Sequence, residues 1–428
     1  MAGLSATRRL PATPLPRAGF GRAAIALAGL ASLAVAMGIG RFAFTPLLPM
    51  MLNDRVIDLA GASWLASANY FGYLVGALLC VAQPWLWSRF EALPPFRTAA
   101  WVRGGLVATV LLTLAMALPL RAAWPALRFG AGVASGIVFV FTSGWCLARL
   151  AERNAPALGG VIYAGPGAGI VLSGFVSSGM VALHWRAASG WLLFGTLAAV
   201  LTALVWPVFR PTAAPPPPAP HPVADAIAGV AAGGKGWRAQ MAWLNVAYGI
   251  AGFGYIITAT FLPVIARQAL PGSVWLDFFW PLFGIGVTAG ALLATRMHAL
   301  ADLRWLLAGG YLVQAAGIAV TVLVPNLVGF ALGSLLVGLP VTAISFFSMQ
   351  EVRRLRPVRA APSMGLLTAM YGVGQIAGPQ LVALLLGLSA SQAAGFTLAL
   401  EVAAAALLVG AVIHAVMIRA FPAAGVAS

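Results

Sequence analysis

The stretch GIGRFAFTPLLP at residues 38–49 recurs in altered form as GFGYIITATFLP at residues 252–263. The same interval of 214 residues (252 − 38) separates GALL at 76–79 from GALL at 290–293. A third match, with an interval of 205 residues, pairs Gly160, Gly167 and Gly169 with Gly365, Gly372 and Gly374. Single glycine matches are weak in a chain with 49 glycines, but all of these keep the same order in both halves. The order indicates duplication of one structural unit.

Each unit consists of long apolar runs that are expected to cross a membrane. Of the 428 residues, 61% are hydrophobic and 8% are charged, against roughly 45–50% and about 25% in soluble domains. A helix of about twenty residues crosses a hydrocarbon core of about 30 Å. A β-barrel would alternate apolar and polar residues in segments of about ten, and the continuous Leu, Val, Ala and Gly blocks exclude it. We therefore expect an all-α integral membrane protein.

Twelve such runs form two sets of six, which predicts two six-helix bundles related by pseudo-two-fold symmetry. The expected spans are 22–50, 61–86, 104–120, 126–148, 158–181, 189–209, 239–265, 276–295, 305–325, 327–350, 363–387 and 394–418. The expected domains are an N-terminal tail (1–21), a first bundle (22–209), a linker (210–238), a second bundle (239–418) and a C-terminal tail (419–428). The linker is assigned because PTAAPPPPAPHP and GVAAGGKG have no periodic apolar face.

The net charge of +16 is explained by membrane orientation rather than by nucleic-acid binding. A nucleic-acid surface needs basic side chains gathered on one soluble face, whereas most Lys and Arg residues here lie between apolar runs. Of the 25, 19 fall on the side of the termini and the linker, and 4 fall on the other side. Basic residues are enriched in cytoplasmic segments. Both termini and the linker are therefore predicted to be cytoplasmic.

Residues suited to catalysis or metal binding are scarce. Cys80 and Cys146 lie in apolar runs without CxxC spacing, and neither HExxH nor a His cluster occurs. Eight of the nine acidic residues are expected in loops, namely Asp54, Asp58, Glu91, Glu152, Asp225, Asp277, Asp302 and Glu351. Glu401 is the one carboxylate expected deep in a span. No metal, cofactor or enzymatic activity is predicted.

Several motifs resemble those of the major facilitator superfamily. RFGAGVASG at 128–136 resembles the pattern of its fourth helix, and GPGAGIVLSG at 165–174 resembles the fifth-helix motif associated with antiporters. The stretches 38–51, 68–79 and 143–150 are similar to the YbfB/YjiJ-type bacterial subgroup. The loop after the second span lacks the Asp of the superfamily's gating signature, which puts that gating role in doubt.

The resemblance implies a secondary transporter of a small solute in the bacterial inner membrane. It implies alternating access, with helices one, four, seven and ten lining the path. The expected partners are the lipid bilayer, a small-molecule substrate with an anionic group, and protons. The chain is expected to be a monomer that binds no nucleic acid. Import and export both stay open, and the alternatives are a sensor or scaffold of the same fold and, less favoured, a membrane-embedded enzyme.

Arg41 is the strongest candidate for a substrate-binding or gating residue. An Arg within a span costs about 2.5–3.5 kcal/mol on insertion scales, so we expect it to face the central cavity and to find its partner on another helix, in water or on the solute. The alternative is a structural role, with the side chain snorkelling or packing against helix-terminal carbonyls. The further candidates are Asn69, Tyr70, Arg128, Asn245, Tyr248, Tyr255 and Gln375. These side chains could equally tie helices together.

Two other roles are assigned from residue type. Glu401 is the candidate for proton coupling, because a carrier coupled to protons uses a protonatable carboxylate. The positions expected to serve helix packing or hinge motion are Gly38, Gly40, Pro46, Pro49, Gly165, Pro166, Gly167, Gly169, Gly378 and Pro379. Small residues let helices approach closely, and proline frees backbone carbonyls.

The expected orientation can be tested by cysteine labelling in intact cells. A cysteine near Asp54 is expected to react with an impermeant reagent added outside, and a cysteine in the linker at 215–218 is not. Labelling of the linker cysteine alone would contradict the cytoplasmic placement of the termini.

Overall fold

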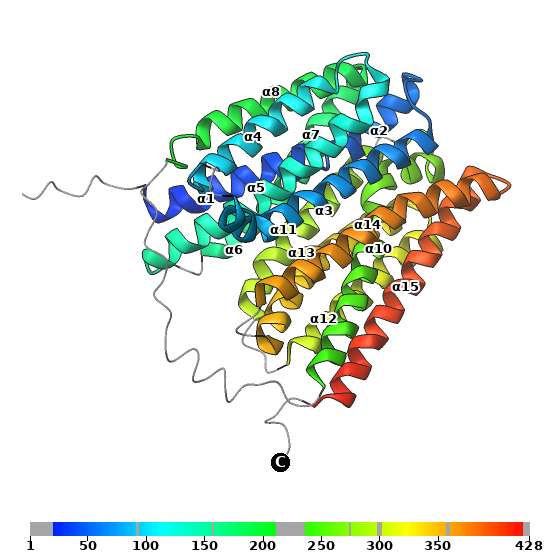
Figure 1. The fold of residues 1–428 in the computed structure, drawn as a ribbon. Coiled ribbons are helices and arrows are strands. Elements are labelled where there is room, and N and C mark those ends of the chain that lie inside the picture. Colours follow the sequence, from blue (N-terminus) through cyan, green and yellow to red (C-terminus); the bar gives the residue numbers. More distant parts are fainter. Residues whose placement is uncertain are drawn as a thin grey trace, which may run out of the picture.

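The computed structural model describes residues 20–90, 94–155, 158–210, 236–273, 275–297, 302–356 and 360–422 (Figure 1). Every regular element within these ranges is helical, and 12 helical segments are long and apolar enough to cross a membrane. Figure 1 shows these helices packed side by side in one bundle. The predicted all-α membrane fold of twelve spans is confirmed.

The first half contains α1 (Arg22–Leu33), the π-helix η1 (Ala34–Ile39), α2 (Phe44–Asn53), α3 (Leu59–Arg89), α4 (Thr98–Ala115), η2 (Arg121–Ala123), α5 (Trp124–Glu152), α6 (Gly159–Tyr163), α7 (Gly165–Ala182) and α8 (Ala187–Val205). The second half contains α10 (Trp237–Ala269), η4 (Leu276–Phe278), α11 (Phe279–Met297), α12 (Leu303–Leu323), α13 (Leu327–Leu355), α14 (Ala360–Leu388) and α15 (Gln392–Ala420). Because the number of spans is even, the first residue of α1 and the last residue of α15 lie on the same side of the bundle. We call this side the termini end and the opposite side the far end.

Several predicted span boundaries differ from the structure, by up to six residues. The third span, expected at 104–120, is α4, which begins at Thr98 and ends at Ala115. The helix accommodates Arg103 because its guanidinium lies 4.5 Å from the Trp206 ring centroid and donates to the Trp206 carbonyl. Most of the predicted linker, residues 211–235, lies outside the described residues, and α10 begins within its expected range at Trp237.

The first span is broken in its middle. In η1 and just after it, the Gly40 N–H donates to the Val35 carbonyl and the Phe42 N–H to the Met37 carbonyl, each five residues back. Such π-bulges are frequently found at functional sites. Pro46 falls in the first turn of α2, where its missing N–H costs no helical hydrogen bond. The break therefore lies between two regular segments, at residues 40–43.

The duplicated glycines make equivalent helix contacts in the two halves. A Cβ on Gly76 of α3 would lie 2.4 Å from the Val133 carbonyl oxygen of α5. In the second half, a Cβ on Gly290 of α11 would lie 1.7 Å from the Leu339 carbonyl oxygen of α13. Only glycine lets these backbones approach so closely. The repeated GALL sequence thus marks the same helix crossing twice.

The two halves meet along three lines of contact. Helix α3 packs against α14, as Figure 1 also shows, α7 packs against α11, and α2 packs against α10. Within the last contact, the Thr45 hydroxyl donates to the Ala259 carbonyl at 2.8 Å, across a separation of 214 residues. This separation equals the repeat interval. Since residues related by a two-fold rotation touch only near its axis, Thr45 and Ala259 mark the axis.

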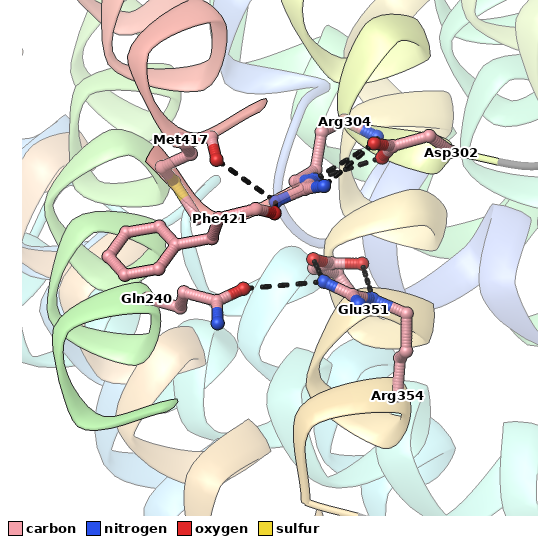
Figure 2. Close-up of polar contacts among 7 residues, drawn as sticks. All are labelled: Gln240, Asp302, Arg304, Glu351, Arg354, Met417 and Phe421. Atoms are coloured by element: carbon pink, nitrogen blue, oxygen red, sulfur yellow. Dashed lines mark hydrogen bonds and ion pairs between the residues drawn. The ribbon is translucent and has the colours of Figure 1, made fainter. Parts of the chain in front are cut away.

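At the termini end, a buried arginine fixes the last turn of α15 (Figure 2). Arg304 donates to the Met417 carbonyl at 3.0 Å and to the Phe421 carbonyl at 2.7 Å, which satisfies acceptors that the helix end leaves open. Asp302 caps α12 and accepts from Arg304 at 2.7 Å. Burial raises the pKa of Asp302, but the hydrogen bonds from Arg304 outweigh it, so the pKa lies below its usual value.

The expectation that Glu351 lies in a loop is wrong. Glu351 belongs to α13, is fully buried and accepts two hydrogen bonds from Arg354, which also reaches Gln240 of α10 (Figure 2). The basic run that follows position 351 suggests a loop from sequence. The helix continues because Arg354, one turn further on, neutralises the carboxylate.

Gly290→Ala is expected to destabilise the protein more than Gly309→Ala. The new methyl group at position 290 would overlap the Leu339 carbonyl, whereas a Cβ at position 309 meets nothing within 4 Å. Overpacking of this kind costs about 1–3 kcal/mol. Thermal unfolding of the two purified variants in the same detergent measures the difference, and equal midpoints would contradict the close crossing of α11 and α13.

Candidate functional site

Arg41 lies in the break of the first span and is almost fully buried. Its guanidinium carbon is 4.2 Å from the ring centroid of Tyr73, 4.9 Å from that of Tyr70 and 5.3 Å from that of Phe42. These distances fit cation–π contacts. Among the described residues, no carboxylate lies within ion-pair distance of Arg41. The cation is therefore held by aromatic faces and neutral groups.

The hydrogen-bond partner of Arg41 comes from the other half of the chain. Its guanidinium donates to the Gln375 side-chain oxygen of α14 at 2.6 Å. The Gln375 amide nitrogen in turn donates to the Tyr255 hydroxyl of α10 at 2.5 Å. Tyr255, which the repeat pairs with Arg41, thus faces it through one intervening amide. Of the three expected sources of a partner, namely another helix, water or the solute, the described residues supply the first.

Three stacked tyrosines continue the site within the second half. The ring of Tyr371 lies 5.8 Å from that of Tyr255 and 4.5 Å from that of Tyr248, with small angles between the planes. Tyr371 precedes Gln375 by one helical turn, so the two side chains share a face of α14. We refer to Arg41, Tyr70, Tyr255, Thr260 and Gln375 as the central polar cluster.

Further hydrogen bonds join the two halves on the far-end side of Arg41. Tyr70 and Thr260 share a hydrogen bond of 2.8 Å between their hydroxyl groups. The Ser67 hydroxyl donates to the Ile376 carbonyl at 3.2 Å and accepts from the Gln380 amide at 2.9 Å. Toward the termini end, by contrast, Phe139 of α5 and Phe346 of α13 are partly exposed.

Arg128 supports the broken span rather than lying at the membrane boundary. Its side chain on α5 is buried and donates to the Gly40 carbonyl at 3.1 Å and to the Arg41 carbonyl at 3.0 Å. Both acceptors belong to the irregular segment. Asn69 of α3 donates to the Arg128 carbonyl at 2.9 Å and so fixes α5 beside α3. Arg128 is a positioning residue for Arg41.

Of the remaining candidates, Tyr248 belongs to the tyrosine stack described above, whereas Glu401 lies apart from it. Asn245 and Tyr248 are buried on α10, and the Asn245 side-chain oxygen has no hydrogen-bond partner in the described part of the chain. Glu401 is exposed on the outer face of α15, away from the central polar cluster. No group of three or more His, Cys, Asp or Glu side chains suited to a metal is found among the described residues.

The glycines expected to pack helices lie at close crossings. A Cβ on Gly38 would lie 2.3 Å from the Gly169 Cα, and one on Gly165 would lie 2.4 Å from the Leu30 carbonyl oxygen. Gly40, Gly167 and Gly378 face side chains of neighbouring helices at similarly short distances. Pro49 and Pro379 lie inside α2 and α14, and Pro166 lies in the first turn of α7.

Sequence reasoning missed Tyr73 and Tyr371, although a signal was present. Tyr73 follows Asn69 by four residues and Tyr371 precedes Gln375 by four, so each lies on the same helical face as a selected polar residue. A search for helical faces that combine polar and aromatic residues, rather than for single polar residues, identifies these aromatic side chains around Arg41.

Comparisons with known proteins agree with this architecture. The sequence profile of the family described as "Uncharacterised MFS-type transporter YbfB" matches residues 33–415. A "Chloramphenicol resistance protein" of Streptomyces lividans is 27% identical over 387 residues, which cover 84% of this chain and 88% of that protein.

Two solved structures share the fold at low sequence identity. A mutant of the nucleoside transporter NupG superposes with a TM-score of 0.68 at 14% identity, covering 92% of this chain and 99% of that chain. A D-xylose-proton symporter superposes with a TM-score of 0.69 at 12% identity, covering 91% and 96%. At these identities the likeness concerns the fold alone.

Arg128→Met is expected to lower stability more than Arg41→Met. The first change leaves the carbonyls of Gly40 and Arg41 buried without a donor, at about 1–3 kcal/mol for each unsatisfied group. The second removes a cation whose neutral partner Gln375 keeps its bond to Tyr255. Thermal unfolding in one detergent measures both, and a larger loss for the Arg41 variant would refute the positioning role of Arg128.

Proposed function

The chain belongs to the family of major-facilitator transporters typified by YbfB, and on that premise we propose that it binds a small organic anion at Arg41 and carries it across the membrane as a secondary active transporter. Membership in this family, with twelve apolar helices, makes it a multi-pass membrane transporter. Beyond family membership, we propose the chemical class of the substrate, the direction of transport and its coupling.

The proposal of an anionic substrate rests on the positive charge of Arg41, which no acidic side chain neutralises among the described residues. A buried cation is costly unless it is paired. Its contacts are aromatic faces and the Gln375 amide, which reduce this cost without neutralising the charge. The neighbouring buried cation, Arg128, adds a second positive charge. A carboxylate or phosphate of the solute would supply the missing negative charge.

Alternating access is supported by the uneven distribution of contacts between the halves. Hydrogen bonds such as Thr45 to Ala259 and Tyr70 to Thr260 close the path on the far-end side of Arg41. Phe139 of α5 packs on Tyr73 beside Arg41 and is partly exposed, and on this ground we propose access from the termini end. With both termini cytoplasmic, as the basic residues favour, this arrangement is an inward-facing state of an inner-membrane carrier. Opening the far side would require these hydrogen bonds to break.

Export is the direction favoured by the comparisons. The relative from Streptomyces lividans is named for resistance to an antibiotic, and an exporter of the same fold could confer resistance. Proton coupling through Glu401 gains no support from its place on the exposed face of α15. The expected linker at 210–238 and the two bundles on either side of it complete the proposed organisation.

Binding of an organic anion at Arg41 can be tested before the natural substrate is known. A panel of monocarboxylates, dicarboxylates and organic phosphates is screened for thermal stabilisation of the purified protein. A ligand at about one hundred times its Kd stabilises by about 2.7 kcal/mol. We expect Arg41→Lys to lose most of that shift, because Lys keeps the charge but loses the planar fork that binds an anion in two places.

Arg103→Lys on α4 is the matched control, since Arg103 is engaged with Trp206 outside the central polar cluster. If the anions raise the unfolding temperature of Arg41→Ala as much as that of the parent protein, Arg41 does not bind them. Uptake of the best anion into proteoliposomes then separates a carrier from a scaffold, which binds the anion without accumulating it.

A further inference from the structure

A cavity of about 450 Å³ opens at the far end of the first half, apart from the central polar cluster. It lies between the end of α2, the connection from α4 to α5 and the start of α8. Its lining residues are Met51, Asp54, Val56, Met116, Ala117, Leu118, Pro119, Arg121, Trp124, Arg186, Ala187, Ala188 and Trp191. Its volume falls in the range of small-molecule sites, roughly 300–1,000 Å³.

Two arginines without an acidic partner among the described residues border this cavity. Of the four basic residues expected on the far side of the membrane, Arg267 is paired with Asp277. Arg121 and Arg186 line the cavity and make no ion pair in the described ranges. The Asp54 carboxylate is engaged with the Ala187 N–H at 2.7 Å, where it caps α8. The cavity therefore has a net positive lining.

A buried donor and an apolar wall complete the cavity. Trp191 is 2% exposed, and its indole N–H has no acceptor in the part of the chain that the structure describes. The indole N–H of Trp124, by contrast, donates to the Leu118 carbonyl at 3.1 Å. The accessible apolar surface of the same space comes from Leu118 and Pro119, which are exposed, and from the partly exposed Val56. A ligand suited to this lining has an anionic group for the arginines and an apolar part for the wall.

We propose that this cavity binds a phosphate-bearing amphiphile, with the phosphate on Arg121 and Arg186 and the apolar part along Val56, Leu118 and Pro119. Guanidinium groups bind phosphate oxygens in two places, and the bonds are charge-assisted. Basic residues are less frequent on the side of a membrane protein that faces away from the cytoplasm. A bound anion explains why two of them lie at one cavity on the far side. The phosphate can belong to an anionic phospholipid of the adjacent leaflet or to a soluble organic phosphate.

The cavity also touches the helix that closes the far side of the transport path. Met51 lies on α2, one end of which carries Thr45 and its contact with Ala259. A ligand against Val56, three residues beyond the end of α2 at Asn53, adds contacts beside this helix. The site is nevertheless independent of Arg41, so its occupancy does not require that the protein be a transporter of anions.

The test is a titration of the purified, delipidated full chain by native mass spectrometry. The probes are phosphatidylglycerol, phosphatidylcholine as the zwitterionic lipid, and glycerol 3-phosphate as the soluble phosphate. We expect the double change Arg121→Gln and Arg186→Gln to weaken phosphatidylglycerol binding at least about tenfold, since two charge-assisted bonds are lost. Arg55→Gln, which removes an exposed charge from the same end outside the lining, is expected to have no such effect.

The single changes Arg121→Gln and Arg186→Gln give intermediate losses and replace the double variant if it does not elute as a folded monomer. Competition by glycerol 3-phosphate identifies the soluble source, and phosphatidylglycerol binding without such competition identifies the lipid headgroup. Two outcomes would overturn the proposal. In the first, the parent and the double variant bind phosphatidylglycerol with equal affinity. In the second, the parent binds phosphatidylglycerol no more tightly than phosphatidylcholine and does not bind glycerol 3-phosphate.

Discussion

The hydrogen bonds from Arg128 to the carbonyls of Gly40 and Arg41 hold the site together. A span interrupted in the bilayer exposes backbone acceptors that lipid cannot satisfy. Arg128 satisfies two of them and so permits the break that turns Arg41 toward the second half. Without the break, Arg41 would lie on a regular helix. The two buried arginines thus have different tasks, one holding the backbone and one presenting a charge.

The charge of Arg41 is presented at the boundary between the halves, where binding can be coupled to motion. Its guanidinium contacts Tyr70 and Tyr73 of the first half and Gln375 of the second. An anion bound there would compete with the Gln375 oxygen for the same donors. Binding would then alter a contact between the halves, which is how a ligand shifts a conformational equilibrium.

Close glycine crossings make the two halves firm units around this boundary. Gly76 and Gly290 bring equivalent helices so near that side chains other than hydrogen do not fit. The two halves also approach each other closely at glycines, such as Gly167 of α7 against α11. In addition, hydrogen bonds of hydroxyl and amide groups such as Thr45, Ser67 and Gln380 connect the halves. Such bonds in membranes contribute on average about 0.6 kcal/mol. Each of these hydrogen bonds between the halves is therefore weak by itself and can break at small cost.

The sequence by itself determined the twelve spans and the duplication and singled out Arg41, because run length, repeat interval and the cost of a buried charge are properties of the chain. Only the tertiary structure decided that Gln375, 334 residues away, is the partner of Arg41. It also decided that Glu351 is buried and Glu401 exposed. Helices that are apolar all round do not encode which face turns inward, so the neighbours of a side chain follow from helix packing.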